Sequence, residues 1–191
     1  MELDKYRPGF VVYTDKHALM TSDGTTTHII AGSYTQDGYR EGVGAEARFN
    51  WIEGFAQISE KLVIVADFWS YCFRLIDRTT NNTSVFSGQC KSHGYQNGRP
   101  GLFNAPHSVV IDKRDKNQLL ITDYWNNAAR TVDVMSQVVG TFVKSDIRGI
   151  TQEEKSGDLY VTSHGAVYRI MYTQRSVLLI SGSPRSPSYR D

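Results

Sequence analysis

Two short segments of the chain combine an aspartate with aromatic side chains. One reads Asp-Phe-Trp-Ser-Tyr at 67–71, and the other reads Asp-Tyr-Trp-Asn-Asn at 123–127. Tryptophan, tyrosine and arginine supply most of the binding energy at many protein interfaces. An aspartate at the start of a turn typically accepts backbone N–H bonds, so we expect Asp67 and Asp123 to lock turns rather than to catalyse a reaction. The two segments therefore predict binding chemistry.

The residues that flank these segments form short apolar runs. The run Lys-Leu-Val-Ile-Val-Ala-Asp at 61–67 is typical, because it is rich in β-branched residues and ends in a turn former. No window of about twelve residues shows the 3.6-residue periodicity of a helix. The sequence therefore predicts an all-β protein.

The runs recur as four similar units. Each unit has four strands, which we call a, b, c and d. Strand b ends at an anchor residue and is followed by a turn, strand c, a hairpin turn and strand d. The anchors are Asp15, Asp67, Asp123 and Ser163. Such units are typical of β-propeller blades. We expect four-stranded antiparallel blades at about 10–32, 55–88, 107–143 and 147–182, a lead-in at 1–9 and a flexible tail at 183–191. The first unit lacks a strand a before Phe10.

Propeller topology would place the b–c turns and the d–a loops on one face. The loops 33–50 and 89–104 would supply selectivity there. Of the aromatic pairs Phe-Trp at 68–69 and Tyr-Trp at 124–125, the first member, Phe68 or Tyr124, could instead pack between blades. The interpretation that we favour is a non-enzymatic scaffold that binds a protein or peptide on this face. Its candidate binding residues are Trp69, Tyr71, Tyr124, Trp125, Arg40, Arg48, Arg99 and Arg130.

The two cysteines and two asparagines bear on localisation. Cys72 begins strand c and Cys90 ends strand d of the same unit, so a disulfide across the hairpin is expected. Asn81 and Asn82 begin overlapping Asn-x-Ser/Thr sequons on the hairpin between those strands, where a glycan could be carried. Both features favour an extracellular or secreted domain, as part of a larger protein. The Ser-Pro-rich stretch at 183–187 would suit a cytoplasmic protein instead.

Composition argues against several other classes. The chain has 21 Lys and Arg residues against 20 Asp and Glu residues, so a nucleic-acid partner is disfavoured. No apolar stretch approaches the length that crosses a membrane, so no membrane insertion is expected. The first ten residues contain no apolar core of a signal peptide.

Several short stretches resemble the NHL repeat. They are Ala-Gly at 31–32, Phe-Asn at 49–50 and again at 103–104, and Ala-Asp at 66–67. The resemblance covers about residues 10–182 and is best over 31–143. It implies a propeller, usually of six blades, of which about four are present here. Phe49 and Phe103 would then plug between blades. Open blade edges would expose unpaired strands, which self-association or another partner could cover.

The NHL resemblance also implies two alternatives. One is a zinc-dependent peptidyl-α-hydroxyglycine lyase, in which His107 would match a zinc ligand; His17, His93 and His164 map to the same face. The equivalent positions of the other units carry no histidine, and a catalytic zinc needs about three protein ligands. The other alternative is an RNA-binding propeller with a basic face. We expect neither a metal nor a cofactor.

Overall fold

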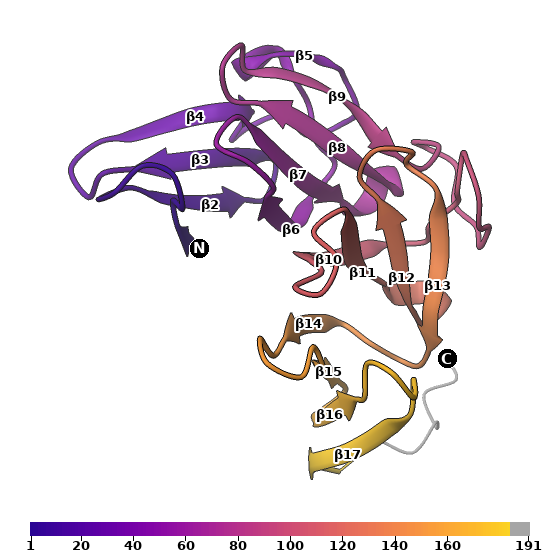
Figure 1. Cartoon of the computed structure of the whole chain (residues 1–191). Coiled ribbons are helices and arrows are strands. Elements are labelled where there is room, and N and C mark those ends of the chain that lie inside the picture. Colours follow the sequence, from indigo (N-terminus) through magenta and orange to yellow (C-terminus); the bar gives the residue numbers. More distant parts are fainter. Residues whose placement is uncertain (184–191) are drawn as a thin grey trace.

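The computed structural model describes residues 1–183, and in it the chain forms four antiparallel sheets that fan around a common centre as blades of a β-propeller (Figure 1). These residues contain no α-helix, only three single turns of 3-10 helix. The prediction of an all-β propeller with four four-stranded blades is confirmed. The tail predicted at 183–191 lies outside the described residues, except for residue 183.

Each blade is a meander whose strands pair in sequence order. The first blade contains β1 (Glu2–Leu3), β2 (Val11–Asp15), β3 (Ala18–Ser22) and β4 (Thr27–Gly32), and the second contains β6 (Ile52–Gln57), β7 (Leu62–Asp67), β8 (Cys72–Asp77) and β9 (Asn82–Ser87). The third contains β10 (Pro106–Ile111), β11 (Gln118–Asp123), β12 (Ala128–Asp133) and β13 (Val139–Lys144), and the fourth contains β14 (Gly149–Gln152), β15 (Leu159–Ser163), β16 (Ala166–Ile170) and β17 (Val177–Gly182).

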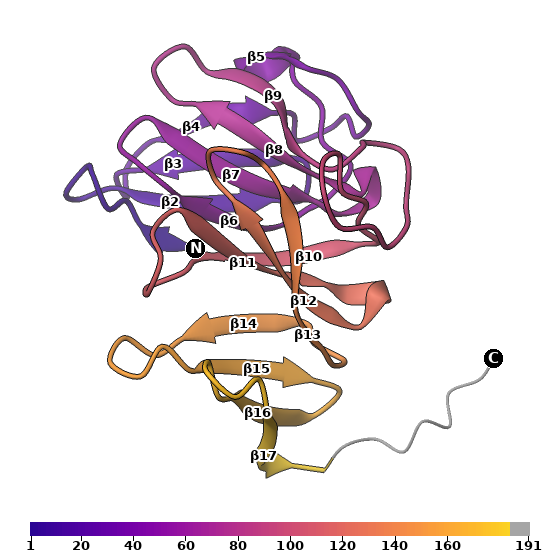
Figure 2. The ribbon, with the colours of Figure 1, turned by 45° about the vertical axis from the view of Figure 1, so that its right-hand side comes forward.

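The core lies between successive blades, which follow one another in chain order (Figure 2). Fully buried Phe49 joins apolar side chains of the first two blades, and fully buried Phe103 does the same for the second and third. Both phenylalanines therefore plug between blades, as the sequence predicts. A third cluster, with Leu120 on one side and Val161 on the other, joins the last two blades.

The first blade corrects one expectation. It does have an innermost strand, because Glu2 and Leu3 pair with Val12 and Val11 of β2. The strand is only two residues long and has no apolar run, which is why the sequence pattern did not reveal it. The segment 1–9, predicted as a lead-in, thus contributes a strand to the first blade.

The two long loops also lie differently from the expectation. Within the loop 33–50, β5 (Gly42–Val43) pairs with β9 and becomes a fifth strand of the second blade. In the loop 89–104, Gly98 pairs with Val139 of β13. Each loop therefore runs along the outer edge of the blade that follows it, instead of lying entirely on the face formed by the b–c turns.

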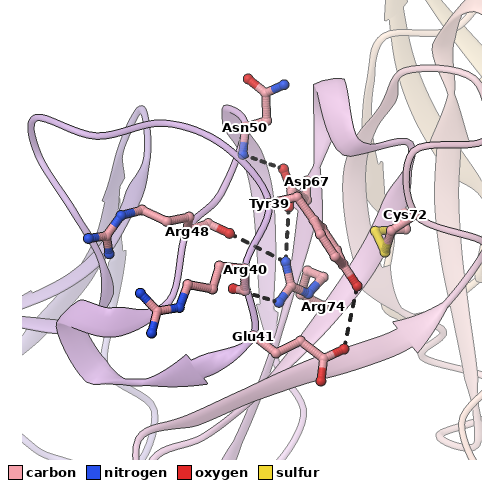
Figure 3. Close-up of a disulfide and its surroundings, with 9 residues drawn as sticks. Tyr39, Arg40, Glu41, Arg48, Asn50, Asp67, Cys72 and Arg74 are labelled. Carbon is pink, nitrogen blue, oxygen red and sulfur yellow. Dashed lines mark hydrogen bonds and ion pairs between the residues drawn. A yellow bond between two sulfur atoms is a disulfide. The ribbon is translucent and has the colours of Figure 1, made fainter.

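A buried arginine holds each of these loops. Arg74 of β8 donates to the carbonyl oxygens of Arg40 and Arg48 (Figure 3). Arg130 of β12 donates in the same way to the carbonyl oxygens of Gln96 and Leu102. The two arginines occupy equivalent places, seven residues after Asp67 and Asp123 respectively, in the two blades that follow a long loop.

The outermost strand of the last blade differs from its equivalents. All six residues of β17 are exposed, and its four apolar side chains, Val177 to Ile180, are 39–54% exposed. The equivalent strands β4, β9 and β13 each contain buried residues. This apolar strand is the surface to which the predicted self-association would apply, and that association stays a prediction.

A candidate binding surface around Trp69 and Trp125

The b–c turns of the second and third blades have the same construction. Asp67 ends β7, and its Oδ1 accepts a bond from the backbone N–H of Asn50 at 2.7 Å; Asp123 and Asn104 repeat this contact at 2.7 Å. Single 3-10 turns follow, η2 (Phe68–Ser70) and η3 (Tyr124–Asn126). The N–H of the tryptophan in each turn, Trp69 or Trp125, donates to the carbonyl of the same asparagine. The aspartates accept backbone N–H bonds, as predicted, but from the asparagine of the preceding loop and not from their own 3-10 turns. That asparagine in turn holds the tryptophan backbone.

The two tryptophans form one aromatic surface. The ring centroids of Trp69 and Trp125 are 5.1 Å apart with the planes at 70°, an edge-to-face arrangement. Their side chains remain 41% and 46% exposed. Phe68 is buried beneath them, with its ring 4.9 Å from Trp69 and 5.9 Å from Trp125. The exposed apolar area is therefore shared between two blades and supported from below.

The two candidate tyrosines lie on either side of this pair in different surroundings. Both are partly buried. The Tyr124 ring lies 6.2 Å from that of His107, near the centre of the propeller. The Tyr71 ring lies 5.3 Å from that of His93, in the first part of the loop 89–104. Tyr124 thus extends the surface inward, and Tyr71 extends it toward the loop.

The predicted group of arginines does not form beside the tryptophans. Arg130 is fully buried, because its guanidinium pairs with Asp123 at 2.6 Å. Arg99 donates to the carbonyl of Ser136, which lies in the hairpin between β12 and β13, at the far end of the blade. Arg48 is occupied by bonds to its own loop. Arg130 is thus inaccessible to a ligand, whereas Arg99 lies away from the tryptophans and Arg48 bonds to its own loop.

The fourth predicted arginine, Arg40, is exposed, and its side chain points away from Asp67 and Arg74 (Figure 3). The arginine that does adjoin the aromatic surface is Arg148, which the sequence analysis missed. Its Cζ lies 4.5 Å from the centre of the Tyr124 ring. The signal that could have found it is its position directly before β14, which matches the position of His107 in β10.

The electrostatic surroundings of the buried Asp67 and Asp123 also indicate a structural role. Burial raises the pKa of Asp67 to about 7, while Arg74 at 3.3 Å acts in the opposite direction. Burial likewise raises the pKa of Asp123, while the bond from the backbone N–H of Asn104 and the charge of Arg130 lower it in part. Both carboxylates are completely buried and have all their contacts within the protein. They are therefore poorly placed to act on a ligand.

The histidines do not assemble a metal site. The described residues contain no group of three His, Cys, Asp or Glu side chains that could hold a metal ion. His107 lies 3.7 Å from Glu53, whereas His17 contacts Trp51 and His164 lies 2.6 Å from Asp146. The ligand set that the zinc lyase alternative requires is therefore missing from residues 1–183.

Cys72 and Cys90 form the disulfide that the sequence predicts, with their Cα atoms 5.0 Å apart. It ties the start of β8 to the start of the loop 89–104, and the N–H of Lys91 donates to the carbonyl of Ser70 beside it. The first residues of this loop are thus fixed next to the turn that carries Trp69. The predicted sequons lie at the opposite end of the blade, where Asn82 is exposed at the start of β9.

A cavity of about 250 Å³ lies along the innermost strands of all four blades. Residues Met1, Glu53, Ser108 and Ile150 contribute to its lining.

Among residues 1–183, no helix is both long and apolar enough to span a membrane.

Comparison with known proteins places the fold but not a family. No family model matches the chain, and no curated protein matches it. Solved structures do match, at sequence identities that show the fold alone. One is a protein of unknown function from Bacteroides thetaiotaomicron, with a TM-score of 0.62, 15% identity and coverage of 92% of this chain and 46% of that one.

Two further solved structures are similar over most of the chain. A chain of the nidogen/laminin complex has a TM-score of 0.65 and 10% identity, covering 91% of this chain and 61% of that one. The extracellular domain of a one component system from B. thetaiotaomicron has a TM-score of 0.63 and 12% identity, covering 98% of this chain and 22% of that one. The chain spans less than two thirds of each of these three structures.

Proposed function

We propose that the protein is a non-enzymatic, extracellular binding module that holds a protein or peptide on the surface around Trp69 and Trp125. The observation that carries the proposal is the edge-to-face pair itself, which is exposed and shared by two blades. Exposed tryptophans that are held in one conformation lose little entropy on binding and are typical anchors of protein interfaces.

The shape of the surface favours a macromolecular ligand. The tryptophans stand on the tips of turns and not inside an enclosed pocket, where small-molecule ligands are usually buried. Tyr124 and Tyr71 extend the apolar area on two sides. The first residues of the loop 89–104, which the disulfide fixes, border it at His93. We assign ligand selectivity to this part of the loop and to Tyr124.

Two finer assignments accompany this proposal. We assign the middle two blades to the NHL type, supported by the recurring Phe-Asn pair before the innermost strand and by the aspartate that ends the second strand. We assign the domain to an oxidising, extracellular compartment, supported by the Cys72–Cys90 disulfide. The solved structures that resemble the chain include an extracellular domain.

Selection of peptides from a random display library on the folded protein tests the proposal. The affinity of the selected peptides is then measured for the native chain and for three single variants. Trp69→Ala and Trp125→Ala should each weaken binding by about 30-fold, as expected for anchor residues. Trp51→Ala is the matched control, because Trp51 is also exposed but contacts His17 instead. Equal losses in all three variants, or none, would reject this surface.

A further inference from the structure

The innermost strands of three successive blades place different charged or polar groups at equivalent positions along the propeller axis. These groups are Glu53 in β6, His107 in β10 and Arg148 directly before β14. The residue after each one contacts the penultimate residue of the second strand of its blade. The contacts are Gly54 with Ala66, Ser108 with Thr122 and Gly149 with Thr162. A carboxylate, an imidazole and a guanidinium therefore occupy equivalent positions around the centre of the propeller.

Close approach of the strands brings two of these groups into contact. A Cβ atom at Gly54 would lie 2.6 Å from the carbonyl oxygen of His107, so only glycine allows β6 and β10 to come this close. Across this contact, the Glu53 carboxylate lies 3.7 Å from Nε2 of His107. Burial lowers the pKa of His107, Glu53 opposes this effect and Arg148 adds to it. The negative charge of Glu53 is thus directed at His107.

The guanidinium of Arg148 is held in place without an ion pair. Its Cζ lies 4.5 Å from the centre of the Tyr124 ring, and it donates to the Tyr124 hydroxyl. Its backbone is fixed on both sides, by its N–H to the carbonyl of Thr162 and by its carbonyl to the hydroxyl of Thr122. Among residues 1–183 no carboxylate lies within 4.0 Å of this exposed side chain. It is an oriented cation with unused donors.

The aromatic surface continues directly to this position. The Phe68 ring lies 4.9 Å from Trp69 and 6.2 Å from His107, and the His107 ring lies 6.2 Å from Tyr124. Successive ring contacts therefore connect the tryptophans with Tyr124, and the guanidinium of Arg148 lies against Tyr124 at the inner end of this series. Arginine presents several donors in one plane, which match a carboxylate better than any other common peptide group.

We propose that Arg148 binds a carboxylate of the ligand while a neighbouring apolar side chain of that ligand packs on Trp69 and Trp125. This inference rests on the proposed function and adds the chemistry of the ligand to it. The carboxylate belongs either to the C-terminal residue of a peptide or to an aspartate or glutamate within it. On the Glu53 side of His107, an anion would meet a like charge, which confines the carboxylate to the Arg148 side.

Three small probes test this inference on the full chain labelled with ¹⁵N. They are N-acetylphenylalanine, its amide, and N-acetyl-aspartyl-phenylalaninamide, followed through the indole N–H signals of Trp69 and Trp125. The free acid should bind about fivefold more tightly than the amide, as expected for one exposed charge-assisted contact. Arg148→Gln should remove this preference and leave the amide affinity unchanged. Arg99→Gln, at the far end of the blade, should change neither affinity.

The probes distinguish a C-terminal from an internal carboxylate, and they test the carboxylate site separately from the aromatic anchor. Preference for the aspartyl probe over the free acid would assign the site to an internal acidic residue, and the reverse would assign it to a C-terminus. Equal affinity of all three probes, or a preference that survives in Arg148→Gln, would overturn the carboxylate site and leave the aromatic anchor standing. No movement of either indole signal with any probe would count against both.

Discussion

The guanidinium of Arg130 lies 2.6 Å from the carboxylate of Asp123, and both side chains are completely buried. Arg74 and Asp67 repeat this ion pair in the preceding blade, at 3.3 Å. Each arginine also donates to two carbonyl oxygens of a long loop, and each aspartate fixes the turn that carries a tryptophan. The ion pairs therefore connect the outer edge of a blade with the candidate binding surface.

Arg130→Ala should reduce the free energy of unfolding by about 3–5 kcal/mol, because it leaves Asp123 buried without its partner. Arg99→Ala is the control, since this arginine is exposed and makes a single bond to a carbonyl. Its effect should stay within about 0.5 kcal/mol. Urea unfolding of both variants measures the difference. A loss below about 1 kcal/mol for Arg130→Ala would show that the pair is not a main support of the fold.

Removal of the disulfide should cost about 3 kcal/mol, since Cys72 and Cys90 close a loop with a sequence separation of 18 residues. Guanidinium unfolding with and without a reductant measures this loss. The double variant Cys72→Ala/Cys90→Ala should start from the lower stability and no longer respond to the reductant. Mass spectrometry without reduction should find no free thiol in the native chain, and two free thiols would contradict the bond.

The N-terminal segment should be sensitive to acid through Asp4. Burial opposes ionisation of this carboxyl, but bonds from Arg78 and from the N–H of Tyr6 outweigh it and hold its pKa below 3.8. Because the folded pKa is the lower one, the ionised carboxylate stabilises the fold above pH 3.8. This contribution is lost as the pH falls through the folded value.

Asp4→Asn should therefore flatten the decline in stability below about pH 4, measured by urea unfolding across the acid range. Asp37→Asn, at an exposed position of the loop 33–50, should leave the decline in place. A direct NMR titration in which the Asp4 carboxyl protonates at or above pH 3.8 would contradict the proposed ion pair with Arg78.

Expression through a eukaryotic secretory pathway should add one N-linked glycan, at Asn82. Asn82 is exposed at the start of β9, while Asn81 is less exposed, adopts a left-handed turn conformation and accepts a bond from the N–H of Gly44 at its backbone carbonyl. Ser84→Ala, which destroys only the Asn82 sequon, should abolish the mass increment. Asn81→Gln should leave it unchanged. An increment that follows Asn81 instead would refute the assignment.

The fold was predictable from the sequence because its main signals are local. Strand β7 is one apolar run that ends at Asp67, and the same pattern recurs at Asp123. The phenylalanine plugs and the disulfide also follow from positions within one repeat. Strand β1 has two residues and no apolar run, so its pairing with β2 depends on tertiary structure and left no pattern.

The candidate binding surface was predictable only in part. The two tryptophans were found because their turns belong to the repeat. Arg130 was misassigned, although the shared spacing of seven residues between Asp67 and Arg74 and between Asp123 and Arg130 indicated a paired structural role. Arg148 has no aromatic neighbour in sequence, and its place beside Tyr124 depends on how two blades pack against each other.

The most direct test of the account uses the three tryptophans of the chain as reporters. In a ¹H–¹⁵N NMR titration with a selected peptide, the indole signals of Trp69 and Trp125 should move together and with one Kd, while that of Trp51 stays in place. Movement of the Trp51 signal alone, or saturation by the peptide with Trp69 and Trp125 unmoved, would contradict the claim that these two side chains form the binding surface.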